Sequence, residues 1–458
     1  MTCTQAVLFA FFLFLPIARG ATKSPAPDPV ALFKSYLRVD TSNPPGHEMR
    51  AVRFWKRFFD KEGIEVTVYD MGHDRGNVLA RIRGSGRKHP FIFLNHLDVV
   101  PADRARWKEP PFSAIERDGR IYGRGAVDMK GSAVSQALEL VTAKREKWKL
   151  DRDLIFLGTA DEEAGDQSGV LWMLEKHARD LGDPELVMTE GNDILVKDGK
   201  TFAWNVATAE KTRLELHLVA HGIASHPVDF NSKPAIPKLM RALQAISAFP
   251  FPIVPIPSVE RYFKQMVPYV SPDRQKAYAD IRATLKDEAW RDRLLKDEDF
   301  GPLLHSTSAI TMLKAGEKEN IVPGEASAVV DMRLMPGDDP KAVVAQLRKA
   351  IDDSDVEITY PAVEAAGESS NDTDLFRAIL KARDTFDPGI PVMTPPLTST
   401  TDAPFFRQRG IVVYGFEPFR LSDEDDHSHG DDEFLSRANL DFSIKVTRFI
   451  AEQVTRSP

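Results

Sequence analysis

Helical and strand-like hydrophobic patterns alternate along the first part of the chain. Apolar side chains recur at helical spacing over residues 31–39 and 129–147. Short runs that are apolar on both strand faces occur at three places: residues 90–98, 153–163 and 185–190. Strands of this kind, joined by helices, indicate a mostly parallel sheet that is covered by helices on both sides.

The pattern changes near residue 208. Residues 213–220 and 326–333 alternate between apolar and polar positions, which is typical of half-buried antiparallel strands. Helical patterns at 234–246 and 340–351 accompany them, and the first pattern resumes from about residue 370. The fold we expect is therefore an α/β catalytic domain interrupted by a smaller α+β domain. Its parts are 21–207 and 363–458 for the catalytic domain and 208–362 for the insertion.

The N-terminus has the pattern of a secretory signal peptide. Residues 6–18 are an unbroken apolar run that is too short to span a bilayer comfortably. Small residues follow, so the sequence predicts cleavage after Gly20 and a secreted or periplasmic protein with no stable membrane span after cleavage. Because no Lys or Arg precedes the run, an uncleaved anchor is the alternative. Cys3, the only cysteine, lies in this segment, so the mature chain would have no disulfide, thiolate ligand or cysteine nucleophile.

Charge is concentrated in one stretch near the C-terminus. The formal net charge is −8, and residues 422–434 contribute seven carboxylates and no Lys or Arg. The rest of the chain is close to neutral, so its charge gives no indication of a nucleic-acid partner. The acidic stretch is either a solvated loop or the carrier of a metal ligand, and in the second case the ligand is His427 or His429.

The predicted parallel strands all end in side chains that can bind a metal. His96 and Asp98 end the first strand, and because residues two apart share a side, the carboxylate can orient the imidazole. Acidic residues 161–163 end the second strand, and Glu190 ends the third. Ligands bind at the carboxyl ends of such strands. Imidazoles and carboxylates together suit zinc or a similar ion, with one carboxylate left free to accept a proton from water.

A glycine-rich segment at residues 123–131 surrounds Asp128. It predicts a tight turn at the start of a helix, where the carboxylate either caps the helix or reaches the metal site. The segment does not have the Gly-Lys-Ser/Thr ending of a phosphate-binding P-loop.

In this order and spacing, the motifs resemble the co-catalytic zinc peptidase family. That family includes bacterial glutamate carboxypeptidase, aminoacylase, succinyl-diaminopimelate desuccinylase and carboxypeptidase S. The resemblance extends from about residue 31 to the C-terminus. It rests on six motifs: VDTSNPPGHE (39–48), NHLDVVP (95–101), GRGAVDMKG (123–131), DEEAG (161–165), TEG (189–191) and HGDDE (429–433).

The resemblance implies a centre of two Zn²⁺ ions per chain, for which Co²⁺ or Mn²⁺ could substitute. The implied ligands are two histidines and three carboxylates: His96, Asp128, Glu163, Glu190 and His429. Asp128 would bridge the ions, with His96 and Glu190 on one and Glu163 and His429 on the other. Glu162 would be the general base, which takes a proton from the bridging water and passes it to the leaving amine. Asp98 would hold the His96 ring.

The inserted domain would act as a lid and as the contact of a homodimer. By resemblance, His226 stabilises the oxyanion, commonly in the partner subunit's site. Asn320 and Arg333 match lid residues that bind the carboxylate and polar groups of the substrate, and a guanidinium suits a carboxylate. The alternatives are structural roles for all three side chains. Residues 398–402 resemble a loop beside the site, with no role assigned.

The expected activity is zinc-dependent hydrolysis of amide bonds in small peptides or N-acyl amino acids. A glutamate at position 190 is typical of the carboxypeptidases and acylases of the family, whereas dipeptidases and aminopeptidases tend to have aspartate. A dipeptidase on the same scaffold is the nearest alternative. A catalytically inactive binding protein is a second alternative, although Glu162 and all five implied ligands are present.

Overall fold

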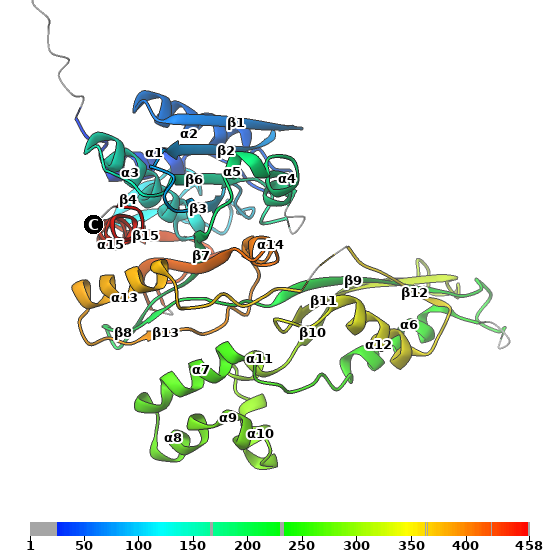
Figure 1. Cartoon of the computed structure of the whole chain (residues 1–458). Coiled ribbons are helices and arrows are strands. Elements are labelled where there is room, and N and C mark those ends of the chain that lie inside the picture. The colour runs from blue at the N-terminus through cyan, green and yellow to red at the C-terminus, as the bar shows by residue number, and fades with distance from the viewer. Residues whose placement is uncertain are drawn as a thin grey trace, which may run out of the picture.

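A computed structural model describes residues 25–164, 168–229, 233–361, 363, 365–422 and 424–456 (Figure 1). The predicted signal peptide at residues 1–20 lies outside these described ranges. Within them, no helix is both long enough and apolar enough to cross a membrane.

A mixed sheet of eight strands forms the centre of the larger part of the molecule. Its middle strands pair in parallel, as the sequence predicts: β6 (Leu154–Thr159), β3 (Phe91–His96), β7 (Leu186–Lys197) and β14 (Val412–Leu421). Antiparallel pairing extends the sheet beyond both sides of this centre. The outer strands are β1 (Glu65–Gly72), β2 (Arg75–Ile82), β8 (Lys200–Asn205) and β13 (Val392–Met393), the last of which pairs with β8 in parallel.

Side-chain alternation along the central strands gives the sheet two apolar faces. In β3, Phe91 and Phe93 belong to one hydrophobic core, whereas Ile92 and Leu94 belong to another. The first core packs under five helices: α1 (Pro29–Leu37), α2 (Met49–Lys61), α3 (Ser132–Arg145), α13 (Asp374–Phe386) and α15 (Arg437–Thr455). The second packs under three: α4 (Ser168–Lys176), α5 (Ala178–Leu181) and α14 (Ala403–Arg407). The prediction of a sheet covered on both sides is confirmed.

A separate antiparallel sheet is formed by strands from the middle of the chain. Its order is β10 (Thr307–Ala315), β11 (Glu325–Leu334), β9 (Thr212–His221) and β12 (Val356–Thr359). Alternate residues Leu214, Leu216 and Leu218 of β9 share a core with α6 (Ala235–Ser247) and α12 (Pro340–Ile351). The expected class, an α/β fold with an additional α+β sheet domain, is confirmed (Figure 1).

Five short helices between α6 and β10 have a hydrophobic core of their own, in which the rings of Phe263, Tyr278 and Phe300 meet. These helices are α7 (Pro257–Met266), α8 (Pro272–Ala279), α9 (Ile281–Thr284), α10 (Glu288–Leu295) and α11 (Gly301–Leu304). Arg261 on α7 donates hydrogen bonds to Thr208 and Thr394, which fixes the helices to the larger part of the molecule.

Candidate metal centre

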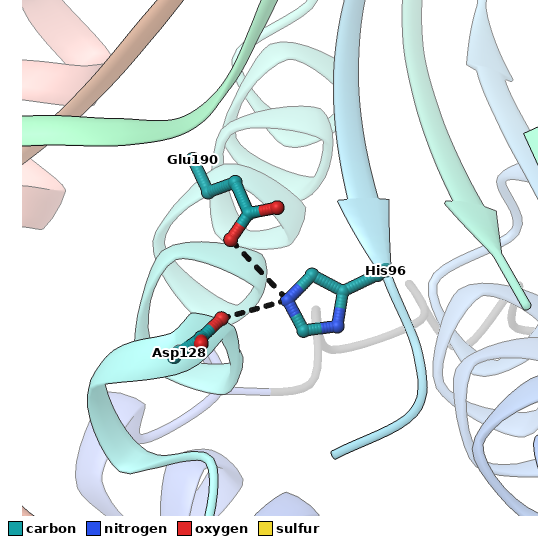
Figure 2. Close-up of side chains that lie close together, drawn as sticks. All are labelled: His96, Asp128 and Glu190. Carbon is teal, nitrogen blue, oxygen red and sulfur yellow. Dashed lines mark hydrogen bonds and ion pairs between the residues drawn. The ribbon is translucent and has the colours of Figure 1, made fainter. Parts of the chain in front are cut away.

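One group of side chains lies where the carboxyl end of β3 meets the middle of β7. His96 is the last residue of β3, and its Nε2 lies 2.8 Å from Asp128 Oδ1 and 3.4 Å from Glu190 Oε2 (Figure 2). Glu190 lies inside β7, which continues to Lys197, so the prediction that Glu190 ends this strand is wrong. Asp128 lies in the turn η1 (Ala126–Gly131) before α3. Together the three side chains could hold a metal ion.

A second group shares Asp128 with the first. His429 Nε2 lies 2.9 Å from Asp128 Oδ2 and 3.1 Å from Glu163 Oε2. This group could also hold a metal ion. The two oxygens of Asp128 thus face different histidines, which is the arrangement of a carboxylate that bridges two sites. His427, the other histidine of the acidic stretch, instead bonds the Glu424 backbone carbonyl through Nε2, at 3.1 Å.

Electrostatics favours positive charge between these side chains. Burial alone would lower the pKa of His96, but the charge of Glu190 and the hydrogen bond to Asp128 raise it well above its usual value. Hydrogen bonds to Asp128 and Glu163 raise the pKa of His429 to about 10. Burial raises the pKa of Glu190 to about 7. Carboxylates this close repel one another, so protons or cations must accompany them.

The donor set fits divalent metal ions. Two imidazoles and three carboxylates offer the nitrogen and oxygen ligands that zinc takes in catalytic sites. Glu163 Oε1 is buried and has no hydrogen-bond partner among the described residues. An unpaired buried carboxylate oxygen is costly unless it binds a cation, so we conclude that the residues present suit a metal centre.

Glu433 holds the turn that presents Asp128. Its buried carboxylate accepts hydrogen bonds of 2.8 Å from the backbone N–H groups of Gly125 and Val127 and from Arg124 Nη1. Arg124 also donates to the backbone carbonyl of His429, at 3.3 Å. Gly125 has φ 81°, and a Cβ there would lie 2.6 Å from Val99 Cγ1, so the turn requires glycine. Glu433 therefore ties the Asp128 turn to the loop that carries His429.

Asp98 contacts the site differently from the sequence prediction. His96 Nδ1 lies 2.9 Å from the backbone carbonyl oxygen of Asp98 but 3.8 Å from its Oδ1. The carboxylate instead accepts hydrogen bonds from the backbone N–H groups of Glu162, at 3.3 Å, and Glu163, at 3.0 Å. The Asp98 backbone thus orients the imidazole, while the side chain holds the segment that carries two other site residues.

A cavity of about 420 Å³ adjoins both groups. Glu162 lines it beside Glu163, and burial raises the pKa of Glu162 well above its usual value. The segment that resembles a family loop forms another wall through Ser399, Thr400 and Thr401. Glu162 therefore faces the same space as the proposed ligands.

Three further acidic residues line the cavity and were not identified from the sequence: Asp193, Glu417 and Asp426. Glu417 lies in the middle of β14 and is almost fully buried, and its carboxylate accepts a hydrogen bond from Ser132 Oγ. A glutamate inside an otherwise apolar strand was the signal that could have identified Glu417.

Only one of the three predicted lid residues approaches this cavity within the chain. Arg333, on β11, donates from Nη1 to Thr400 Oγ1 at 3.3 Å, and Thr400 lines the cavity. His226 and Asn320 are exposed and do not belong to the cavity lining. Their segments lie together, since Ser225 forms a β-bridge with Val322.

Comparison with known proteins connects this centre with hydrolases. Residues 92–453 match the model of peptidase family M20/M25/M40. The chain is 29% identical over 386 residues to the N-fatty-acyl-amino acid synthase/hydrolase PM20D1 of Xenopus tropicalis, covering 80% of this chain and 73% of the relative. It is 24% identical over 415 residues to aminoacylase-1 of Sus scrofa, covering 87% of this chain and 90% of the relative.

A solved structure shares the fold over nearly the whole chain. The M20 family metallo-carboxypeptidase Sso-CP2 of Sulfolobus solfataricus superimposes with a TM-score of 0.74 at 19% sequence identity, covering 93% of this chain and 99% of that one. At this identity the likeness concerns the fold alone.

The anchoring role of Glu433 gives a prediction. Glu433→Gln replaces one acceptor oxygen by an NH₂ group among N–H donors, so the Asp128 turn should loosen. We expect divalent metal to bind about 10- to 100-fold more weakly, as is typical when a residue that orients metal ligands is changed. Metal content after dialysis against graded chelator would measure this. Glu116→Gln, at a partly exposed carboxylate paired with Arg437, is the matched control. Unchanged metal affinity in Glu433→Gln would contradict the anchoring role.

Proposed function

The chain belongs to peptidase family M20/M25/M40 and is a hydrolase of amide bonds, and within that activity we propose a carboxypeptidase or N-acyl amino acid amidohydrolase with Glu162 as its general base. One observation carries the proposal: Asp128 lies between two histidine-carboxylate groups, and Glu162 faces the cavity beside them. The printed names of the relatives, an N-acyl amino acid hydrolase and an aminoacylase, support the substrate class.

Two divalent ions, zinc in the first instance, are the proposed cofactors. His96 and Glu190 would hold one ion and Glu163 and His429 the other, with Asp128 contributing one oxygen to each. When bound, the ions supply Lewis acidity, which polarises a carbonyl group and makes water acidic enough to lose a proton near neutral pH.

Glu162 is the proposed acceptor of that proton. Its burial makes the carboxylate a stronger base than it would be in water, which suits a group that must accept a proton and release it again. The same side chain then delivers the proton to the leaving nitrogen. The Asp98 carboxylate accepts a hydrogen bond from the Glu162 backbone N–H group and so holds the segment that carries the base.

Arg333 is the proposed partner of the substrate's carboxylate. It reaches Thr400 at the cavity wall, and Asp331 Oδ1 accepts a hydrogen bond of 2.8 Å from its Nε. Its Nη2 also donates to Asp331 Oδ2, at 3.4 Å, so Asp331 orients the guanidinium from one side. The remaining N–H groups of Nη1 and Nη2 are left for a substrate carboxylate, which a guanidinium suits.

A homodimer through the inserted domain is also proposed. Strand β10 is an edge of its sheet, and its Met312 and Leu313 side chains are 66% and 65% exposed. Met240, on the adjoining helix α6, is exposed as well. An edge strand with exposed apolar side chains can pair with a second copy. The partner's lid could then supply His226, which does not line the cavity of its own chain.

Residues 1–20 are proposed to direct secretion, on the strength of their apolar run and the small residues around Gly20. N-terminal sequencing of exported protein should begin at Ala21, and retention of residues 1–20 would contradict cleavage.

The central test of function is a panel of N-acyl amino acids and dipeptides, with amine release as the readout. Wild-type protein should hydrolyse N-acyl amino acids or C-terminal peptide bonds and lose this activity to a chelator. Glu162→Gln should bind the same amount of metal while kcat falls by about 10²- to 10⁴-fold, the usual contribution of a general base. Full hydrolysis by Glu162→Gln would exclude the proposed mechanism. Activity confined to dipeptides with a free amino group would favour the dipeptidase alternative.

Arg333→Met tests carboxylate recognition. We expect KM to rise about 10- to 100-fold for substrates with a free carboxylate, because a charge-assisted hydrogen bond is lost. Substrates whose carboxylate is converted to an amide should be hydrolysed equally by variant and wild type. An equal KM increase for both kinds of substrate would assign Arg333 a structural role.

Subunit complementation tests the dimer. His226→Ala and Glu162→Gln should each be inactive alone, but a mixture that exchanges subunits should regain about a quarter of wild-type activity, because half of the dimers then contain one complete site. Leu313→Glu on both chains, which should separate the subunits, is the control and should abolish the recovery. A wild-type protein that is monomeric by light scattering, or a mixture that stays inactive, would exclude the shared site.

A further inference from the structure

Asn43 lies buried between two acidic residues next to the site. It is 1% exposed and sits in the segment between α1 and α2. Its Nδ2 donates hydrogen bonds to Asp98 Oδ2, at 2.8 Å, and to Asp161 Oδ1, at 3.0 Å. Its Oδ1 accepts a hydrogen bond of 3.1 Å from Arg75 Nη2. Both amide hydrogens of Asn43 are therefore used to join two carboxylates.

Both carboxylates hold the segment that carries Glu162 in place. Asp98 accepts hydrogen bonds from the backbone N–H groups of Glu162 and Glu163. Asp161 directly precedes Glu162 and has φ 70°, in the left-handed region that residues other than glycine seldom occupy. Such a conformation persists only where the surroundings impose it. Here the Asp161 side chain is held by Asn43 and by an ion pair with Arg75 Nη1.

Repulsion between the acids makes these donors necessary. Glu48, Asp98 and Asp161 each place a carboxylate oxygen within 4.8 Å of the others, and all three side chains are buried. A cation could also fill such a group. However, Asp98 already accepts three N–H donors and Asp161 is paired with Arg75, so the chain itself compensates these two carboxylates. The carboxylate of Glu48 is buried and has no hydrogen-bond partner among the described residues. Burial raises the pKa of Glu48 to about 7, which reduces the charge that the group carries near neutral pH.

We propose that Asn43 and Arg75 are positioning residues for catalysis: by binding Asp98 and Asp161 together, they fix the 161–163 turn and direct Glu162 into the cavity. The inference rests on the proposed function, because it assigns a task to the base of that reaction. Neither residue lines the cavity, so their effect on the reaction passes through Asp98, Asp161 and the turn that these two carboxylates hold.

The inference predicts a separation of kcat from substrate binding. Asn43→Asp keeps the side-chain shape, but it replaces the Nδ2 group, which donates to two carboxylates, by an oxygen of a third carboxylate. We expect kcat to fall about 100-fold, with KM and metal content within about twofold of wild type, because the base moves while the substrate contacts remain. Arg75→Gln removes the ion pair with Asp161, and the Arg75 side chain is only 23% exposed, so this variant should also lower kcat.

A second readout does not depend on activity. In metal-free protein, amide hydrogen exchange in residues 160–164 should be about tenfold faster in Asn43→Asp than in wild type, because the N–H groups of Glu162 and Glu163 lose their fixed acceptor. Asn439→Ala is the matched control. The Asn439 side chain makes two hydrogen bonds, both with the backbone of Arg420, and Asn439 lies outside the cavity lining. This variant should keep wild-type kcat and wild-type exchange in residues 160–164.

The outcomes separate this inference from the proposed function. Wild-type protein without amide hydrolysis would overturn the proposed function and the catalytic part of this inference with it. Active wild type with unchanged kcat and exchange in Asn43→Asp would overturn the positioning role alone. Loss of metal in proportion to lost kcat would also overturn it, since Asn43 would then act on the ligands. If Asn43→Asp does not fold, the same measurements on Arg75→Gln test the positioning role.

Discussion

Repulsion among buried carboxylates is the constraint on which the site depends. The chain resolves it in two ways. Glu433 and Asp98 are surrounded by N–H donors and hold backbone segments. Asp128, Glu163 and Glu190 instead face imidazoles and the cavity. The carboxylates that accept backbone N–H donors are therefore structural, and those that face the two imidazoles are the proposed metal ligands.

The sheet gives this arrangement a rigid base. Both faces of the central strands are covered by hydrophobic cores, so the strands that carry His96 and Glu190 are held in place relative to each other. Other site residues come from turns, and each turn is tied to a distant segment. Glu433 accepts from Arg124 across 309 residues, and Asn43 donates to Asp161 across 118. Strands thus place some of the side chains, and long-range hydrogen bonds place the others.

Strand ends were the most predictable feature of the chain. An apolar run followed by a histidine or an acid indicates both a buried strand and a side chain near its end. His96 and Glu163 were placed in this way, and Glu190 was identified by the same pattern although β7 continues beyond it. The roles of Asp98 and Glu433 could not be predicted from such local patterns, because their hydrogen-bond partners lie far away in the sequence. The antiparallel strand β1 was missed for a related reason: most of it is exposed or half-buried, so it lacks the apolar run that identified the central strands.

The central claim is that one aspartate joins two metal sites at the edge of this sheet. Anomalous X-ray scattering from crystals grown with zinc, measured at the zinc absorption edge, tests it most directly. The account predicts two peaks per chain on either side of Asp128, one between His96 and Glu190 and the other between Glu163 and His429. A single peak, or a second peak away from His429, would contradict it.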